Sequence, residues 1–100
     1  MERVLPEYIT DAGKKFKRMD YSRNEKSLLL HYLKKEGVLF EAGGYVTDVV
    51  TEMATQIPDG GYRDDQYEWS TQDIYHIEKY NASVKEDFIA NVKRKMQMKG

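Results

Sequence analysis

The sequence predicts a mainly helical α+β protein: a single compact domain over residues 1–100, with about four to five helices and a small β-hairpin near 38–47. Three observations lead to this prediction. Apolar residues recur at helical spacing in several segments, Ser-x-x-Glu or Ser-x-x-Asp capping signals precede three of them, and glycine-containing turns separate them. Because these signals agree, we expect the helices to bury their apolar faces around one core.

Two helices are predicted before the hairpin. Pro6 suits the first turn of a helix whose apolar positions are Leu5, Tyr8, Ile9, Ala12, Phe16 and Met19. Ser22 and Glu25 form a capping box that begins a second helix, and Gly37 supplies a left-handed stop. The apolar and aromatic residues of this second helix are Leu28, Leu29, Leu30, Tyr32 and Leu33.

The middle of the chain predicts a short hairpin followed by a helix. Val-Leu-Phe and Tyr-Val-Thr flank Glu-Ala-Gly-Gly, whose glycines suit a hairpin turn. Thr47 can then cap a helix over 47–57, with one face made of Val49, Val50, Met53, Ala54 and Ile57. An alternative extends the second strand through Val50, because β-branched residues adjoin there. Pro58-Asp59-Gly60-Gly61 predicts a turn, and Tyr62 to Trp69 an acidic, aromatic loop or edge strand.

Two further helices are predicted at the C-terminal end. Ser70 and Asp73 begin a helix that carries Ile74, Ile77 and Tyr80, and Asn81-Ala82 forms a short corner. Ser83 and Glu86 form another capping box, which begins a final helix. Its apolar stripe consists of Val84, Phe88, Ile89, Val92 and Met96. Across the whole fold, we expect the core to be built from Phe16, Leu29, Leu30, Leu33, Phe88 and Val92.

Charge is sorted along the chain. Residues 1–40 carry nine Lys/Arg against six Asp/Glu, residues 41–78 carry nine acids with Arg63 as the only base, and residues 79–100 carry six bases against two acids. Such blocks bear on partners and association rather than on the fold. Self-association is therefore one hypothesis, because the acidic middle of one chain could meet the basic ends of another.

The acidic block also contains interleaved aromatic residues, and together they form the leading candidate for a partner-binding surface. Carboxylates spaced along a surface can imitate nucleic-acid phosphates and pair with a basic protein, including a nucleic-acid-binding protein. Exposed Tyr and Trp side chains add typical interface anchors. The predicted residues are Asp59, Tyr62, Asp64, Asp65, Tyr67, Glu68, Trp69 and Asp73. They predict a small accessory or inhibitor protein that acts by occupying a partner's surface.

DNA or RNA binding is the alternative function. The helix-corner-helix over 70–97 resembles a DNA-reading motif in outline, and basic clusters could contact phosphates. The residues for this role are Lys14, Lys15, Lys17, Arg18, Lys85, Lys93, Arg94 and Lys95. Glu86 and Asp87 at the start of the last helix would repel phosphates, so nucleic acid is the less favoured partner.

The composition argues against several other classes. The sequence contains no Cys, which excludes disulfides, thiol catalysis and Cys-ligated metal sites. Neither His31 nor His76 follows a zinc pattern, and both are expected to pack or to form hydrogen bonds. No signal peptide or membrane span of about 18 apolar residues is evident. We expect a cytoplasmic protein that is not an enzyme and has no metal or cofactor.

Overall fold

The computed structural model describes residues 2–3, 18–35 and 40–98 of the chain. Within these residues the elements follow the order β1 (Glu2–Arg3), α1 (Arg23–Lys35), β2 (Phe40–Asp48), β3 (Met53–Arg63), β4 (Tyr67–Ser70), α2 (Thr71–Tyr80) and α3 (Glu86–Met98). The strands form one sheet in the order β1-β4-β3-β2. β1 pairs with β4 in parallel, and the other neighbours pair antiparallel.

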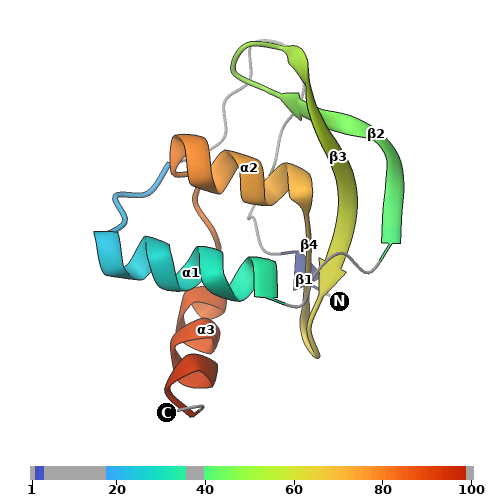
Figure 1. Cartoon of the computed structure of the whole chain (residues 1–100). Helices are drawn as coiled ribbons and strands as arrows, with labels where there is room; N and C mark the ends of the chain where they lie inside the picture. The colour runs from blue at the N-terminus through green and yellow to red at the C-terminus, as the bar shows by residue number, and fades with distance from the viewer. Residues whose placement is uncertain (1, 4–17, 36–39, 99–100) are drawn as a thin grey trace.

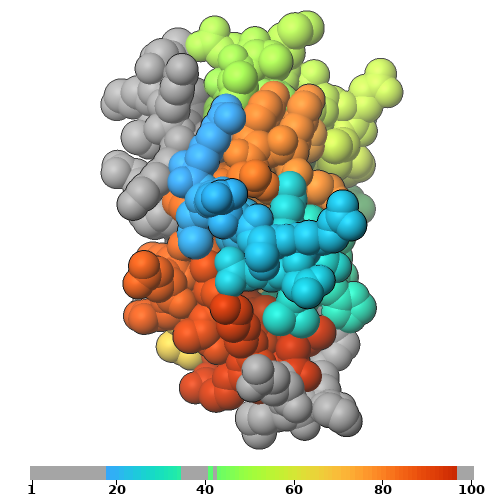
Figure 2. All heavy atoms as spheres, turned by 90° about the vertical axis from the view of Figure 1, so that its left-hand side faces the viewer, coloured from blue at the N-terminus to red at the C-terminus, as the bar shows by residue number. Residues whose placement is uncertain are grey.

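The helices lie together on one side of the sheet (Figure 1). α2 lies beside β3, α1 runs alongside α2, and α3 extends from beneath α1. Viewed from the helical side, α2, α1 and α3 form a continuous layer, and the β2–β3 hairpin projects beyond α2 (Figure 2). Among the described residues, no helix combines the length and the apolarity needed to cross a membrane.

The predicted fold class of four to five helices with one small hairpin is wrong. The described residues contain three helices and a four-stranded sheet, which makes this a small α+β fold. The predicted helix over 47–57 is instead the end of β2, a turn over 49–52 and the start of β3. Its apolar residues fit helical spacing, but strand pairing and a left-handed Glu52, with φ of 62°, fix a hairpin turn there.

The position of the predicted hairpin turn is also wrong. Gly43 and Gly44 do not reverse the chain, because β2 continues through them to Asp48. Both have φ of +77°, a conformation that favours glycine, and the β2–β3 register shifts on either side of Tyr45. Glycines that predict a turn therefore produce an irregularity inside a strand, and residues 38–39 of the predicted hairpin lie outside the described part.

The segment 58–70 contains the end of β3, a short turn over 64–66 and β4. β3 and β4 are the two central strands, whereas the sequence predicted a turn followed by a loop or an edge strand. Pro58 to Gly61, predicted as a turn, lies within β3. Tyr62 and Trp69 are cross-strand partners in the β3–β4 hairpin. The alternation in β4, where Tyr67 and Trp69 are buried and Glu68 is exposed, is the pattern of a strand with one covered face.

Three of the predicted helices are present. Ser22 accepts a hydrogen bond from the Glu25 N–H at the start of α1, and Ser70 and Asp73 form the expected capping box of α2. Asn81 ends α2 in a left-handed conformation, as the predicted corner requires. The capping box of Ser83 and Glu86 is wrong, because the first helical bond of α3 goes to the Lys85 carbonyl. The helix predicted from Pro6 and the stop at Gly37 lie outside the described residues, apart from Arg18 and Met19.

The core lies between the helices and the inner face of β4. Leu29, Leu33, Phe88 and Val92 are buried as predicted, whereas Leu30 is only partly buried. Phe16 falls outside the described residues. The Phe88 ring meets Tyr67 edge-on at 5.0 Å between centroids and also contacts Tyr32 and Trp69. The two aromatic residues of β4 therefore complete the core and hold the β3–β4 hairpin against α3.

Candidate functional site

The aromatic residues of the predicted partner-binding surface face inward. Tyr67 and Trp69 are 2% and 3% exposed, and the Trp69 indole N–H donates to the Leu33 carbonyl at 3.0 Å. Tyr62 is partly buried and stacks on Trp69 with 9° between the ring planes. These rings pack in the core of the folded chain, so they are not available as exposed anchors.

Three of the predicted acidic residues serve the backbone. Asp73 is fully buried and accepts from the Ser70 N–H in the α2 capping box. Asp59 accepts from the N–H groups of Gly60 and Gln72. Asp64 accepts from the N–H groups of Gln66 and Tyr67, which closes the β3–β4 turn. Glu68, in contrast, is exposed and lies opposite Arg63 in the strand register.

Asp64 also belongs to a polar cluster that joins the β3–β4 turn to α1 and α3. The Tyr32 hydroxyl donates to Asp64 at 2.5 Å, Lys95 lies 3.5 Å from Asp64, and Lys95 donates to the exposed Asp65. Burial, followed by the bond to Asp64, raises the pKa of Tyr32 to about 12, so this hydroxyl remains a donor. Burial opposes the ionised form of Asp64, but the bonds from Tyr32, Tyr67 and Gln66 hold its pKa below the usual range.

Four basic side chains of the nucleic-acid alternative have partners within the fold: Arg18, Lys93, Arg94 and Lys95. Lys93 pairs with Glu25 at 2.9 Å, Arg94 donates to Asn91 at 2.7 Å, and Lys95 pairs as above. The Arg18 guanidinium lies over the Tyr80 ring, and the Lys85 carbonyl accepts the first helical bonds of α3. Lys14, Lys15 and Lys17 lie outside the described residues.

The charge blocks of the sequence interleave in space. Lys95 and Lys79, from the basic C-terminal block, meet Asp64, Asp65 and Asp48 of the acidic block. Lys34, from the basic N-terminal block, pairs with Glu78 at 3.0 Å. Charges that are segregated along the chain are therefore matched within one molecule, which removes much of the reason to expect a basic partner for the acidic block.

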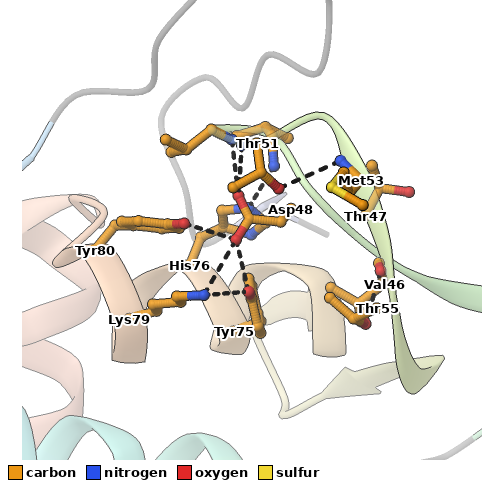
Figure 3. Close-up of polar contacts among 12 residues, drawn as sticks. Val46, Thr47, Asp48, Thr51, Met53, Thr55, Tyr75, His76, Lys79 and Tyr80 are labelled. Carbon is orange, nitrogen blue, oxygen red and sulfur yellow. Dashed lines mark hydrogen bonds and ion pairs between the residues drawn. The ribbon is translucent and has the colours of Figure 1, made fainter.

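The folded chain brings together a different set of residues, on the face of α2 that meets β2 (Figure 3). The Gln72 side-chain amide accepts from the Thr47 N–H at 2.9 Å and donates to the Thr47 carbonyl at 2.6 Å. One turn later, His76 Nε2 accepts from the Val49 N–H at 3.0 Å. β2 is the edge strand of the sheet, so Gln72 covers its backbone at Thr47, where a neighbouring strand would otherwise pair, and His76 holds the turn that follows.

Asp48 is the centre of this contact between α2 and β2. One carboxylate oxygen accepts from the hydroxyls of Tyr75 and Tyr80, each at 2.6 Å, and Lys79 lies 3.5 Å from it. The other oxygen accepts from two N–H groups of the turn over 49–52. Burial would raise the pKa of Asp48, but the bonds from both tyrosines and from the turn outweigh it and hold that pKa far below the usual range.

Beyond this contact, the hairpin is exposed and almost uncharged. We define the arm as residues 43–58; it contains only two charged residues, the buried Asp48 and Glu52, in a chain that is 33% charged. The large hydrophobic residues that are exposed in the described structure all belong to it: Tyr45 at 60%, Val50 at 49%, Met53 at 68% and Ile57 at 40%. The β2–β3 register places Tyr45 with Pro58, and Thr47 with Ala54, as cross-strand pairs, and all four are exposed.

The described residues contain no group of three or more His, Cys, Asp or Glu that could hold a metal ion. His76 is buried and bonded at both ring nitrogens, so it is placed to hold the backbone rather than to meet a substrate. Comparisons of the chain with protein-family models, with curated proteins and with solved structures find no match.

The sequence contained a signal for the contact between α2 and β2 that its apolar pattern did not use. Gln72, Tyr75, His76, Lys79 and Tyr80 recur at helical spacing, which places them along one face of α2. That face lies beside the apolar stripe of Ile74 and Ile77 and carries mostly hydrogen-bonding side chains. A polar stripe is also typical of a solvated helix face, so this stripe is compatible with the contact to β2 but does not by itself predict it.

Replacing Asp64 with Ala is expected to lower the free energy of unfolding by about 2 kcal/mol. The change removes the acceptor for two turn N–H groups and for the part-buried Tyr32 hydroxyl. Glu68→Ala, a matched change at an exposed acid of the same hairpin, is expected to cost less than about 0.5 kcal/mol. Urea unfolding measures both variants, and equal losses would contradict the structural role of Asp64.

Proposed function

We propose that this protein is a small cytoplasmic binding protein that acts by occupying a partner protein's surface, and that the contact is made by the arm. The observation that carries the proposal is the gathering of exposed hydrophobic side chains on this hairpin. An exposed apolar patch on an otherwise charge-rich protein is typical of an interaction site. The role is one of binding rather than catalysis.

The chemistry of the arm indicates what kind of partner it fits. Asp48 is buried, so Glu52 supplies the only exposed charge of the arm, and a charged partner surface would lose hydration without gaining a counter-charge. Gln72 occupies the N–H and carbonyl of Thr47 on the edge strand β2, which disfavours the addition of a partner strand there. We therefore propose an uncharged, apolar groove on the partner, which meets the face and turn of the arm.

Binding through the acidic block and binding of DNA or RNA both have less support than binding through the arm. The acidic block could still meet a basic surface through Glu68 and the exposed Asp65, but Asp65 is already paired with Lys95. DNA or RNA binding would need Lys93, Arg94 and Lys95 to leave Glu25, Asn91 and Asp65. The proposal keeps the binding class predicted from the sequence and moves the contact to the arm.

Site-specific crosslinking tests the proposal. A benzophenone amino acid at Met53 is expected to crosslink one partner protein in the native cell, whereas the same group at Ala90, an exposed residue of α3, does not. With that partner purified, Met53→Lys should weaken binding at least about tenfold, because a buried charge opposes the apolar contact. Ala90→Lys is the matched control and should bind as the wild type does.

Other outcomes would contradict the proposal. Equal crosslinking from positions 53 and 90 would show that the arm is not a specific contact. A crosslinked product of twice the chain mass would assign the arm to self-association, and flotation of the protein with neutral lipid vesicles would assign it to a membrane surface. Thermal melts of both Lys variants check the fold, which should change little because both positions are exposed.

A further inference from the structure

We propose that protonation of His76 detaches the turn over 49–52 from α2, so that acidity controls the conformation of the arm; its effect on binding rests on the function proposed above. The contact in question joins α2 to the turn of the β2–β3 hairpin. Two hydrogen bonds of the buried His76 ring fix its protonation state there.

The two bonds of His76 require a neutral imidazole. Nδ1 lies 2.8 Å from the Gln72 carbonyl, which can only accept, so Nδ1 carries the proton. Nε2 lies 3.0 Å from the Val49 nitrogen, whose N–H can only donate, so Nε2 must present its lone pair. The ring is 0% exposed, so water cannot replace either partner without a movement of the turn.

A second proton on Nε2 would turn this attraction into a clash of two donors. The groups around the ring come from both elements. Asp48 of β2 and the Gln72 carbonyl favour the charged ring, Lys79 of α2 opposes it, and the rings of Tyr75 and Tyr80 pack against it. The imidazolium can relieve the clash only if Val49 moves away, and Val49 is part of the turn that begins the arm's return along β3.

The direction of the pH effect follows from burial. Burial, with a smaller contribution from Lys79, lowers the pKa of His76 below 6.5 and outweighs Gln72 and Asp48. The detached state, with the ring in water, has the higher pKa and binds the proton more tightly. Detachment is therefore favoured as the pH falls below about 6.5. Asp48 keeps its charge over this range because its pKa is held far lower, so His76 is the group in this contact that responds.

Nuclear magnetic resonance of the full chain between pH 7.5 and 4.5 tests the inference without any partner. The exchange of the Val49 amide with solvent, corrected for its intrinsic pH dependence, is expected to speed up about tenfold. Its midpoint should match the titration of the His76 ring, while the amide of Leu33 in the core stays protected. His31 is exposed on α1, away from the contact between α2 and the turn, and is the position of the control substitution.

Variants separate the inference from general acid unfolding and from the proposed function. His76→Gln should abolish the pH step at Val49, whereas the matched control His31→Gln should retain it. Titration of His76 with no change in the amide exchange of Val49 would overturn the inference. Loss of the protection of the Leu33 amide at the same midpoint would also overturn it, because the whole fold would then be opening. If His76→Gln does not fold, the wild-type data alone decide between these outcomes. The exchange result does not depend on whether Met53 crosslinks a partner, so the two proposals can fail independently.

Discussion

Replacing Asp48 with Ala is expected to lower the free energy of unfolding by about 3–5 kcal/mol. The carboxylate is 3% exposed and accepts four hydrogen bonds, from the hydroxyls of Tyr75 and Tyr80 and from the N–H groups of Val50 and Thr51. Alanine would leave two tyrosine hydroxyls and two turn N–H groups without their acceptor. Because these groups belong to α2 and to the hairpin turn, the loss separates two elements rather than weakening one.

Urea unfolding measures this effect, with the fluorescence of Trp69, the only tryptophan in the chain, as the probe. Asp48→Asn is the informative companion, because its amide oxygen can still accept from the turn while the charge is lost. Since the folded state lowers the pKa of Asp48, its stabilisation is present above the usual value of 3.8 and is lost as the pH falls. The difference in the free energy of unfolding between wild type and Asp48→Asn should therefore become smaller below about pH 4. A difference that does not change with pH would show that the charge of Asp48 is not its cause.

Phe88→Ala is expected to cost about 3–5 kcal/mol. Phe88 is fully buried, and its ring contacts Tyr32, Tyr67 and Trp69 with centroid distances of 5.0–6.0 Å. Truncation removes a large apolar surface and leaves a cavity where α1, α3 and β4 meet. The surrounding rings are held by bonds such as that from Trp69 to Leu33, so we expect little collapse into the space.

The same urea experiment includes two controls for Phe88→Ala. Phe88→Leu keeps much of the volume and should cost less than half as much. Tyr45→Ala, the truncation of an aromatic residue that is 60% exposed, should change stability by no more than about 0.5 kcal/mol. A loss below about 1 kcal/mol for Phe88→Ala would contradict its central position in the core.

The helices could be predicted from the sequence because their signals are local. Apolar spacing and the pair of Ser70 and Asp73 depend on residues within one or two turns, and α1, α2 and α3 follow from them. The strands depend on partners far along the chain. Met53 and Ile57 fit a helical face equally well, and only their pairing with β2 makes them part of a strand.

The candidate site was harder to predict than the fold for a related reason. Tyr67 and Trp69 alternate with Glu68, a spacing that is typical of a strand with one buried face. Because the surrounding segment is acidic, they were instead predicted to lie on an exposed surface. Gln72 and His76 bind backbone groups of residues 25 and 27 positions earlier, and no local pattern specifies such a bond. The exposed residues Val50, Met53 and Ile57 of the arm fit the helical face predicted over 47–57, so their spacing indicated a buried face rather than an exposed hairpin.

The position of α3 in the fold has a consequence for synthesis of the protein on the ribosome. α3 emerges after the sheet strands and the other helices, yet Phe88 supplies the ring on which Tyr67 and Trp69 pack, and Lys95 supplies the cation for Asp64 and Asp65. A nascent chain that has not yet released α3 from the exit tunnel would present an open aromatic face and uncompensated carboxylates. Stable folding must therefore wait until translation of this region is complete, and during that interval the strands are open to misassociation.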